Sequence, residues 1–135
     1  MNDQTNQRIS RLRRAAFYAR IVTALVLLTM FVGTHIPMEI HTPPELMLDK
    51  VYHLLAFMAL AICALASWEL SVGILQPQHY FVVWLFGTLY GLFDELTQVP
   101  VGRTCEGADW LADVVGIVVG LIVFRLSRPF LYRRI

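Results

Sequence analysis

Four long apolar stretches separated by short polar connections limit what this chain can fold into. They lie at about 15–36, 51–68, 77–98 and 109–126. An α-helix needs about 20 apolar residues to cross the hydrocarbon core of a bilayer. With 57% of its residues hydrophobic and only 16% charged, the chain is also more apolar than a typical soluble domain. The sequence therefore predicts an all-α, polytopic membrane protein, a bundle of four transmembrane helices forming one domain over residues 1–135.

The prolines lie where these predicted helices would begin or end. They fall between the first two stretches, at both ends of the third and after the fourth: Pro37, Pro43, Pro44, Pro77, Pro100 and Pro129. The basic start of the first stretch could instead mark a signal peptide. Its apolar part is long, however, and the following segment "GTHIPMEI" has no small-residue cleavage site. We therefore expect an uncleaved first helix.

Basic residues predict the orientation of the helices. Nine of the eleven lysines and arginines flank the first and last stretches: Arg8, Arg11, Arg13, Arg14, Arg20, Arg125, Arg128, Arg133 and Arg134. Basic flanks of membrane helices stay in the cytoplasm. Four spans would then place the N and C termini in the cytoplasm, and the connections around 37–50 and 94–109 on the outer side.

This topology would bring polar residues of three helices together at the outer side. A spacing of four residues places two side chains on the same helix face. Three pairs show this spacing: Asp49 with His53, Asp94 with Gln98, and Asp109 with Asp113. An Asp at the centre of a spanning helix costs about 2.5–3.5 kcal/mol, and less toward the helix ends. These groups therefore need partners or water, and the three helices can direct them at one point.

Two G-x-x-x-G patterns occur in the third and fourth stretches. They are "GTLYG", with Gly87 and Gly91, and "GIVVG", with Gly116 and Gly120. Such patterns allow membrane helices to approach closely. We expect the third and fourth helices to pack tightly through them, although small residues are also common in membrane helices that make no such contact.

Three blocks of the sequence resemble the VanZ-like family. They are "DKVYHLLAF" at Asp49–Phe57, "LYGLFDELTQVPVGRT" at Leu89–Thr104 and "DWLADVVGIVVG" at Asp109–Gly120, and "THIP" near residue 34 is also similar. The family consists of small membrane proteins whose namesake is associated with resistance to the glycopeptide teicoplanin. The resemblance covers about residues 34–124. It implies a protein of the bacterial cell envelope, integral to the cytoplasmic (inner) membrane, and the topology predicted from the basic residues places the site on the extracytoplasmic side.

The resemblance also implies which residues form this site. The family pattern falls on Asp49, Lys50, His53, Glu95, Gln98, Arg103, Asp109 and Asp113. The chain departs from the pattern at two places. Relatives often have a histidine where Thr97 stands, and a Pro-Gly-Arg where this chain has "VGR" after Pro100. A mechanism that requires that histidine or that turn would not operate here.

The predicted cluster has chemistry suited to a cation or a phosphate. Carboxylates are the ligands that Mg²⁺ and Ca²⁺ prefer, and the candidates for a metal site are Asp94, Glu95, Asp109 and Asp113. Arg103 and Lys50 would suit a phosphate or carboxylate group of a ligand. His53 and Glu95 are candidates for catalytic general acid or base.

Structural explanations compete with this one. Asp49 can cap a helix, Lys50 can extend to the membrane interface, and Arg103 can join two helices by pairing with Glu95 or Asp109. We expect solvated loop charges at Glu39, Glu45 and Glu106, and interfacial histidines at His35, His41 and His79. The expected depths of Cys63 and Cys105 differ too much for a disulfide.

Three classes of function remain. The first is an envelope protein that binds a lipid-linked phosphate, such as a polyprenyl-phosphate-linked precursor, or a lipoglycopeptide. The second is a membrane enzyme acting on a lipid phosphate or pyrophosphate, although the sequence has no P-x-S-G-H, S-R-x₅-H or D-G-x₂-A-R motif. The third is a small proton-coupled exporter, which is disfavoured because Ile21 to Thr34 contains no acid. We expect membrane lipid as a partner and no nucleic acid. The sequence is also compatible with a homo-oligomer.

Overall fold

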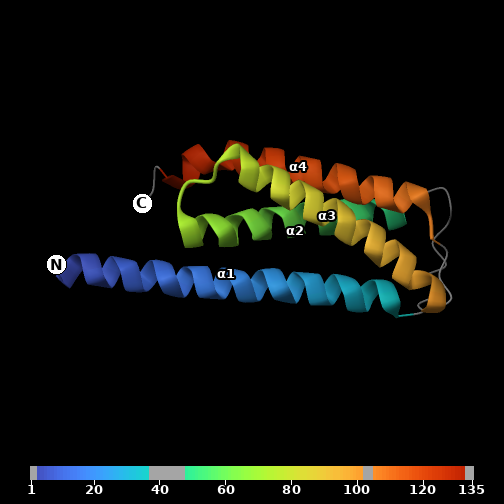
Figure 1. The fold of residues 1–135 in the computed structure, drawn as a ribbon, viewed down its shortest axis with the longest axis horizontal. Coiled ribbons are helices and arrows are strands. Elements are labelled where there is room, and N and C mark those ends of the chain that lie inside the picture. The colour runs from blue at the N-terminus through green and yellow to red at the C-terminus, as the bar shows by residue number, and fades with distance from the viewer. Residues whose placement is uncertain (1–2, 37–47, 102–104, 133–135) are drawn as a thin grey trace.

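The described part of the chain consists of helices. The computed structural model describes residues 3–36, 48–101 and 105–132. The helices are α1 (Asp3–His35), α2 (Leu48–Val72), α3 (Pro77–Gln98) and α4 (Gly107–Tyr132), with a short 3₁₀ turn, η2 (Val99–Val101), after α3 (Figure 1). No strand occurs among these residues. The predicted all-α class is therefore confirmed.

Three of the four helices are longer than predicted. Only α3 has the predicted bounds, beginning at Pro77 and ending at Gln98. Helix α1 begins at Asp3 instead of near residue 15, because its arginine-rich start consists largely of good helix formers that need no apolar pattern. The expectation that α4 would end before Pro129 is wrong. The proline lies near the end of α4, where the hydrogen bond it removes belongs only to the last turns.

Three of the four helices have the length and composition of membrane spans. Helices α1 and α2 and the Gly107–Pro129 part of α4 are long and apolar enough to cross a membrane. Helix α3 is not among them: it has 22 residues, and polar or charged side chains such as His79, Asp94 and Glu95 lie toward its ends. Large apolar side chains, such as Phe17, Leu25, Phe81 and Leu126, face outward, as contact with lipid requires. The four-span topology with cytoplasmic termini stays a prediction.

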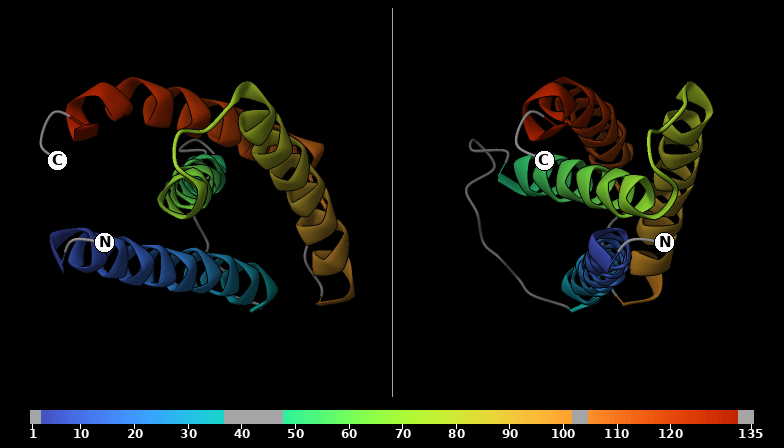
Figure 2. Two further views of the ribbon diagram at one scale, coloured as in Figure 1. Left: turned by 60° about the vertical axis from the view of Figure 1, so that its left-hand side comes forward. Right: turned by 90° about the vertical axis from the view of Figure 1, so that its left-hand side faces the viewer.

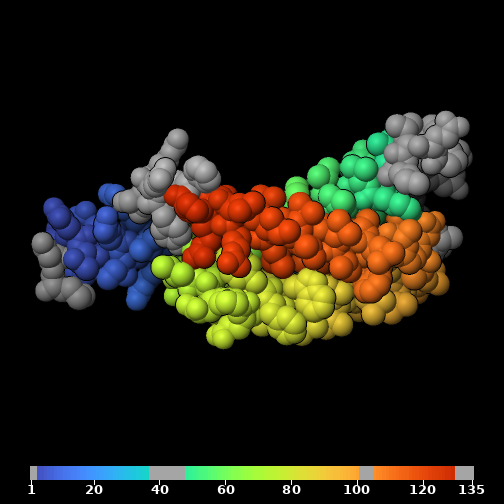
Figure 3. All heavy atoms as spheres, turned by 90° about the horizontal axis from the view of Figure 1, so that it is seen from above, coloured from blue at the N-terminus to red at the C-terminus, as the bar shows by residue number. Residues whose placement is uncertain are grey.

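Helix α2 lies at the centre of the arrangement. It runs between α1 and α4, while α3 closes one side of this layer (Figure 2). The beginning of α1 and the end of α4 lie at one end of the bundle (Figure 1), and the first part of α1 extends past the other helices (Figure 3). The end of α1, the beginning of α2, the end of α3 and the beginning of α4 all lie at the opposite end. The residues that flank the α1–α2 connection and the α3–α4 connection therefore lie at that end.

The glycines of α4 face a different neighbour from the one expected. A Cβ on Gly116 would clash with the carbonyl oxygen of Leu54, and a Cβ on Gly120 would lie 2.6 Å from that of Met58, both in α2. The G-x-x-x-G pattern of α4 thus packs against α2, so its predicted role in an α3–α4 contact is wrong. The pattern marks a helix that approaches another closely but carries no information about which one. The glycines of α3 do face α4, with Gly87 against Ile117.

Candidate functional site

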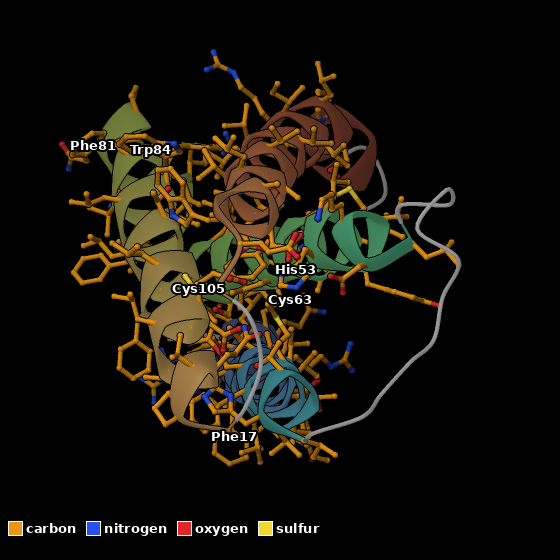
Figure 4. The ribbon with its side chains drawn as sticks, turned by 90° about the vertical axis from the view of Figure 1, so that its right-hand side faces the viewer. Phe17, His53, Cys63, Phe81, Trp84 and Cys105 are labelled. Atoms are coloured by element: carbon orange, nitrogen blue, oxygen red, sulfur yellow. The ribbon has the colours of Figure 1, made fainter. Side chains whose placement is uncertain are left out.

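Six polar side chains are buried together at the end of the bundle where the two connections lie. We call them the buried polar cluster: His53, Asp94, Glu95, Gln98, Asp109 and Asp113, none more than 8% exposed. They come from the first turns of α2, the last turns of α3 and the first turns of α4. Figure 4 looks onto this end and shows His53 among the helices. The structure thus brings together the polar ends of α2, α3 and α4.

His53 and Asp113 form the centre of this cluster. His53 Nδ1 lies 2.9 Å from Asp113 Oδ1, a buried hydrogen bond that joins α2 to α4. No described residue donates a hydrogen bond to the other carboxylate oxygen, Asp113 Oδ2. This oxygen lies against Gly91 of α3, where a Cβ would be only 2.9 Å away. Glycine at position 91 therefore leaves the space that the Asp113 carboxylate occupies.

Neutral donors hold the two carboxylates of α3. Asp94 accepts hydrogen bonds from the Thr34 hydroxyl at 3.0 Å and from Gln98 Nε2 at 2.9 Å. Glu95 accepts one from the backbone N–H of Glu106 at 3.1 Å. Among the described residues, no lysine or arginine pairs with Asp94 or Glu95. The residue before α4 and the end of α1 therefore position these carboxylates, and α1 also places His35 Nδ1 3.9 Å from Asp94 Oδ1.

Lys50 forms the ion pairs at the edge of the cluster. Its Nζ lies 2.7 Å from Asp109 Oδ1 and 3.0 Å from Glu106 Oε2, joining α2 to α4. Glu106 is an exposed loop residue, as expected, and it has two further roles. Its side chain is half exposed, but it pairs with Lys50 while its backbone holds Glu95. Asp49 is exposed beside these residues. Arg103 lies outside the described residues.

Helix α1 supplies two residues that sequence reasoning missed. Thr34 reaches Asp94, and His35 Nε2 lies 3.0 Å from the hydroxyl of Thr97. The His35 ring also stacks on Phe31, with ring centroids 4.0 Å apart. His35 was expected only at a membrane interface, yet it contacts the position where relatives often have a histidine. The one signal for both residues was the similarity of "THIP" to the family.

The remaining predicted positions do not belong to the buried polar cluster as defined above. Cys63 is half-buried within α2 and Cys105 is exposed, and both are free thiols, as predicted. His79 accepts a hydrogen bond from the backbone of Gln76 at the start of α3. Glu39, Glu45 and His41 lie outside the described residues. At the opposite end of the bundle, Glu69 and Arg128 form an ion pair at 3.0 Å between α2 and α4.

Among the residues that the structure describes, two groups have ligand atoms close enough to share one cation. His53, Glu95 and Asp113 each offer an atom, all within 4.8 Å of one another, and all three residues are buried. Asp49, His53 and Asp109 form a second group, in which Asp49 is exposed. The predicted set of four carboxylates is thus divided between the groups, and Asp94 belongs to neither.

Comparison with known families agrees with the blocks in the sequence. A family model described as VanZ/LLP1 matches residues 2–128, nearly the whole chain. The chain belongs to the VanZ/LLP1 family. The resemblance inferred from the sequence is therefore confirmed, and the apolar helices identify a membrane protein of that family. The chain has no match among curated proteins or solved structures.

This VanZ/LLP1 protein also contains an apolar cavity beside the cluster. Its volume is about 380 Å³, and all four helices line it. The lining consists almost entirely of aliphatic and aromatic side chains: Thr23, Leu27, Leu60, Ala61, Ala64, Trp68, Val82, Val83, Phe86, Gly87, Tyr90 and Ile117. Tyr90 stands one helical turn from Asp94, and Ile117 one turn from Asp113. The cavity therefore begins next to the buried polar cluster.

Proposed function

We propose that this protein binds a lipid-linked phosphate at the extracytoplasmic side of the bacterial cytoplasmic membrane. The phosphate head group binds at the buried polar cluster, and the hydrocarbon chain occupies the apolar cavity. The observation that carries this proposal is the position of the cavity, which begins one turn from Asp94 and Asp113 on their own helices. A polar site one helical turn from an apolar cavity matches a ligand with one polar and one apolar part.

The cavity has the size and lining to hold a segment of the hydrocarbon chain of such a ligand. Ligand cavities in proteins commonly measure about 300–1,000 Å³ and are lined mainly by apolar side chains, and this one has a volume of about 380 Å³. Polyprenyl phosphates, their pyrophosphates and lipid-linked envelope precursors combine a long hydrocarbon chain with an anionic head. A lipoglycopeptide of the teicoplanin type also carries an acyl chain, which relates the proposal to the family's association with glycopeptide resistance.

The head group requires positive charge at the cluster. Lys50 is 30% exposed and can reach an anionic ligand while it holds Asp109. Arg103, assigned to the site by the family pattern, would add a guanidinium group suited to phosphate. The predicted topology places both residues on the outer side of the membrane.

An enzyme acting on the same lipid phosphate is the second candidate. The hydrogen bond between His53 Nδ1 and Asp113 favours it, because a carboxylate that holds one ring nitrogen orients the imidazole for proton transfer at the other. Glu95, buried nearby, would be the other candidate acid or base. Binding and turnover differ only in whether a new product appears.

Native mass spectrometry on the purified protein tests the proposal. The protein is incubated with polyprenyl phosphate, polyprenyl pyrophosphate or a lipid-linked wall precursor, with and without Mg²⁺, and both retained lipid and new products are scored. Ala64→Phe fills the cavity, whereas Ala59→Phe places the same ring on the exposed side of α2. We expect the parent and Ala59→Phe to retain lipid and Ala64→Phe to lose at least tenfold in retention.

The outcomes separate the candidates. Equal retention by both phenylalanine variants would show that the cavity does not hold the chain. A product that forms with the parent and disappears with Glu95→Gln would replace the binding protein by the enzyme. The absence of both retained lipid and product would refute both candidates.

A further inference from the structure

We propose that His53, Glu95 and Asp113 bind one first-row divalent cation, of the class of Zn²⁺ or Mn²⁺. The site replaces the all-carboxylate Mg²⁺ or Ca²⁺ site that the sequence predicts. It stands independently of lipid binding, because the three residues carry the necessary geometry themselves.

The donor atoms are already assembled. One ligand atom from each residue lies within 4.8 Å of the other two, and the residues come from α2, α3 and α4. Their exposures are 8% for His53, 2% for Glu95 and 0% for Asp113. The three donors are held by three separate helices and closed to solvent, and they would have to move inward to reach the distance of about 2.0–2.2 Å at which nitrogen and oxygen ligands bind Zn²⁺.

An oxygen without a partner points to the position of the ion. Asp113 Oδ1 takes the hydrogen bond from His53, but none of the residues that the structure describes donates to Asp113 Oδ2. A buried polar atom left without a partner costs about 1–3 kcal/mol. Asp113 Oδ2 lies against Gly91, which shares a face of α3 with Glu95 four residues later. The free oxygen is thus directed toward the helix face that carries the next ligand.

Charge supports the same assignment. Asp94, Glu95 and Asp113 are buried within the cluster, and in the described part of the chain the only basic side chains beside them are those of His35 and His53. Burying carboxylates away from water is expensive unless charge compensates them. A divalent cation supplies two positive charges at the point where the uncompensated carboxylates meet.

The donor types indicate which cation binds. Mg²⁺ and Ca²⁺ prefer ligand sets made only of oxygen atoms. An imidazole nitrogen favours first-row transition metals such as Zn²⁺, and carboxylates also bind Mn²⁺. Three protein ligands leave at least one coordination position for a water or a ligand oxygen, as in catalytic zinc sites. If the proposed function holds, a phosphate oxygen can take that position.

Metal analysis of the full chain tests the site in the absence of lipid ligand. The protein is purified in detergent with an affinity tag that contains no histidine, stripped with chelator, and incubated with Zn²⁺, Mn²⁺, Mg²⁺ or Ca²⁺. After desalting, elemental analysis should find one Zn²⁺ or Mn²⁺ per chain and less than a tenth of that amount of Mg²⁺ or Ca²⁺. Glu95→Gln and Asp113→Asn should lower the affinity at least tenfold.

Asp49→Asn is the matched control, because Asp49 belongs only to the second, partly exposed group of possible ligands. It should retain the ion. Retention by Glu95→Gln and Asp113→Asn, loss in Asp49→Asn alone, or no bound ion in the parent would overturn the proposal. If a variant does not fold, pulsed electron paramagnetic resonance of the Mn²⁺-loaded parent decides. It should detect coupling to a histidine nitrogen, and its absence would exclude His53 as a ligand. Failure here leaves the lipid-retention experiment unaffected, so the two proposals can fail separately.

Discussion

Replacing Gly120 by alanine should destabilise the contact between α2 and α4. The added Cβ would lie 2.6 Å from the carbonyl oxygen of Met58 and 2.9 Å from Cβ of Ala61. Ordinary van der Waals contact begins at 3.4 Å. Neither neighbouring atom is the end of a flexible side chain, so the two helices must move apart to accept the methyl group.

Two opposing effects set the size of the loss. Overpacking a tight contact costs about 1–3 kcal/mol, whereas alanine in place of glycine within a helix contributes up to about 1 kcal/mol. The net effect should be a loss of about 1–2 kcal/mol in the free energy of unfolding. Such a change lowers the ratio of folded to unfolded protein by about 5- to 30-fold.

Unfolding by titration with sodium dodecyl sulfate, followed by circular dichroism in mixed micelles, measures this difference. Gly33→Ala in α1 is the control, because a Cβ at Gly33 meets no atom within 4 Å. The control changes only helix propensity and should be as stable as the parent or slightly more stable. Gly116→Ala, which would clash with the carbonyl oxygen of Leu54, should lose more than Gly120→Ala.

Equal stability of Gly120→Ala and Gly33→Ala would refute the reasoning. Helices α2 and α4 would then not approach as closely as the structure shows, and the distance between His53 and Asp113 would also be in error. His53 directly precedes Leu54, and Asp113 lies three residues before Gly116. The spacing set by the glycines therefore also sets the distance of 2.9 Å between His53 and Asp113.

Two further predictions concern the edges of the buried polar cluster, and the same titration measures both. Lys50→Met should lower the free energy of unfolding by about 1–3 kcal/mol, because it leaves the nearly buried carboxylate of Asp109 without its amine. Glu106→Gln changes the half-exposed partner and should alter it by less than about 0.5 kcal/mol, and an equal loss in both variants would contradict this explanation. Thr34→Val should cost about 1–3 kcal/mol by removing the hydroxyl that reaches Asp94, and Thr34→Ser should restore most of it. A serine variant as unstable as the valine variant would show that the hydroxyl is not the cause.

The meeting of α2, α3 and α4 was predictable because it depends on two simple properties of the chain. Because successive helices run in opposite directions, each helix end lies at one of the two ends of the bundle. A four-residue spacing places two side chains on one helix face. The pair Asp94 and Gln98 shows both properties, and its side chains are hydrogen-bonded at 2.9 Å. The start of α3 was predictable because Pro77 suits the first turn of a helix.

Partner choice between helices was not predictable. The glycines of α4 signal close approach, but nothing in "GIVVG" distinguishes α2 from α3 as the neighbour. Thr34 and His35 stand alone at the end of an apolar helix, so no spacing pattern connects them with Asp94 and Thr97. Glu106 holds Glu95 through its backbone N–H, a group that every residue except proline possesses.

The distribution of charge distinguishes a binding site from a structural ion pair. Lys50 already joins α2 to α4 at the edge of the cluster, and Glu69 with Arg128 joins them at the opposite end. The carboxylates of Glu95 and Asp113 are more deeply buried, and in the described part of the chain neither pairs with a lysine or arginine. Buried charge is weak support for stability, since well-packed apolar residues of similar size are often as stable or more so. Two acids kept inside the bundle, beside a histidine and next to an apolar cavity, therefore favour the proposed binding role over a purely structural one.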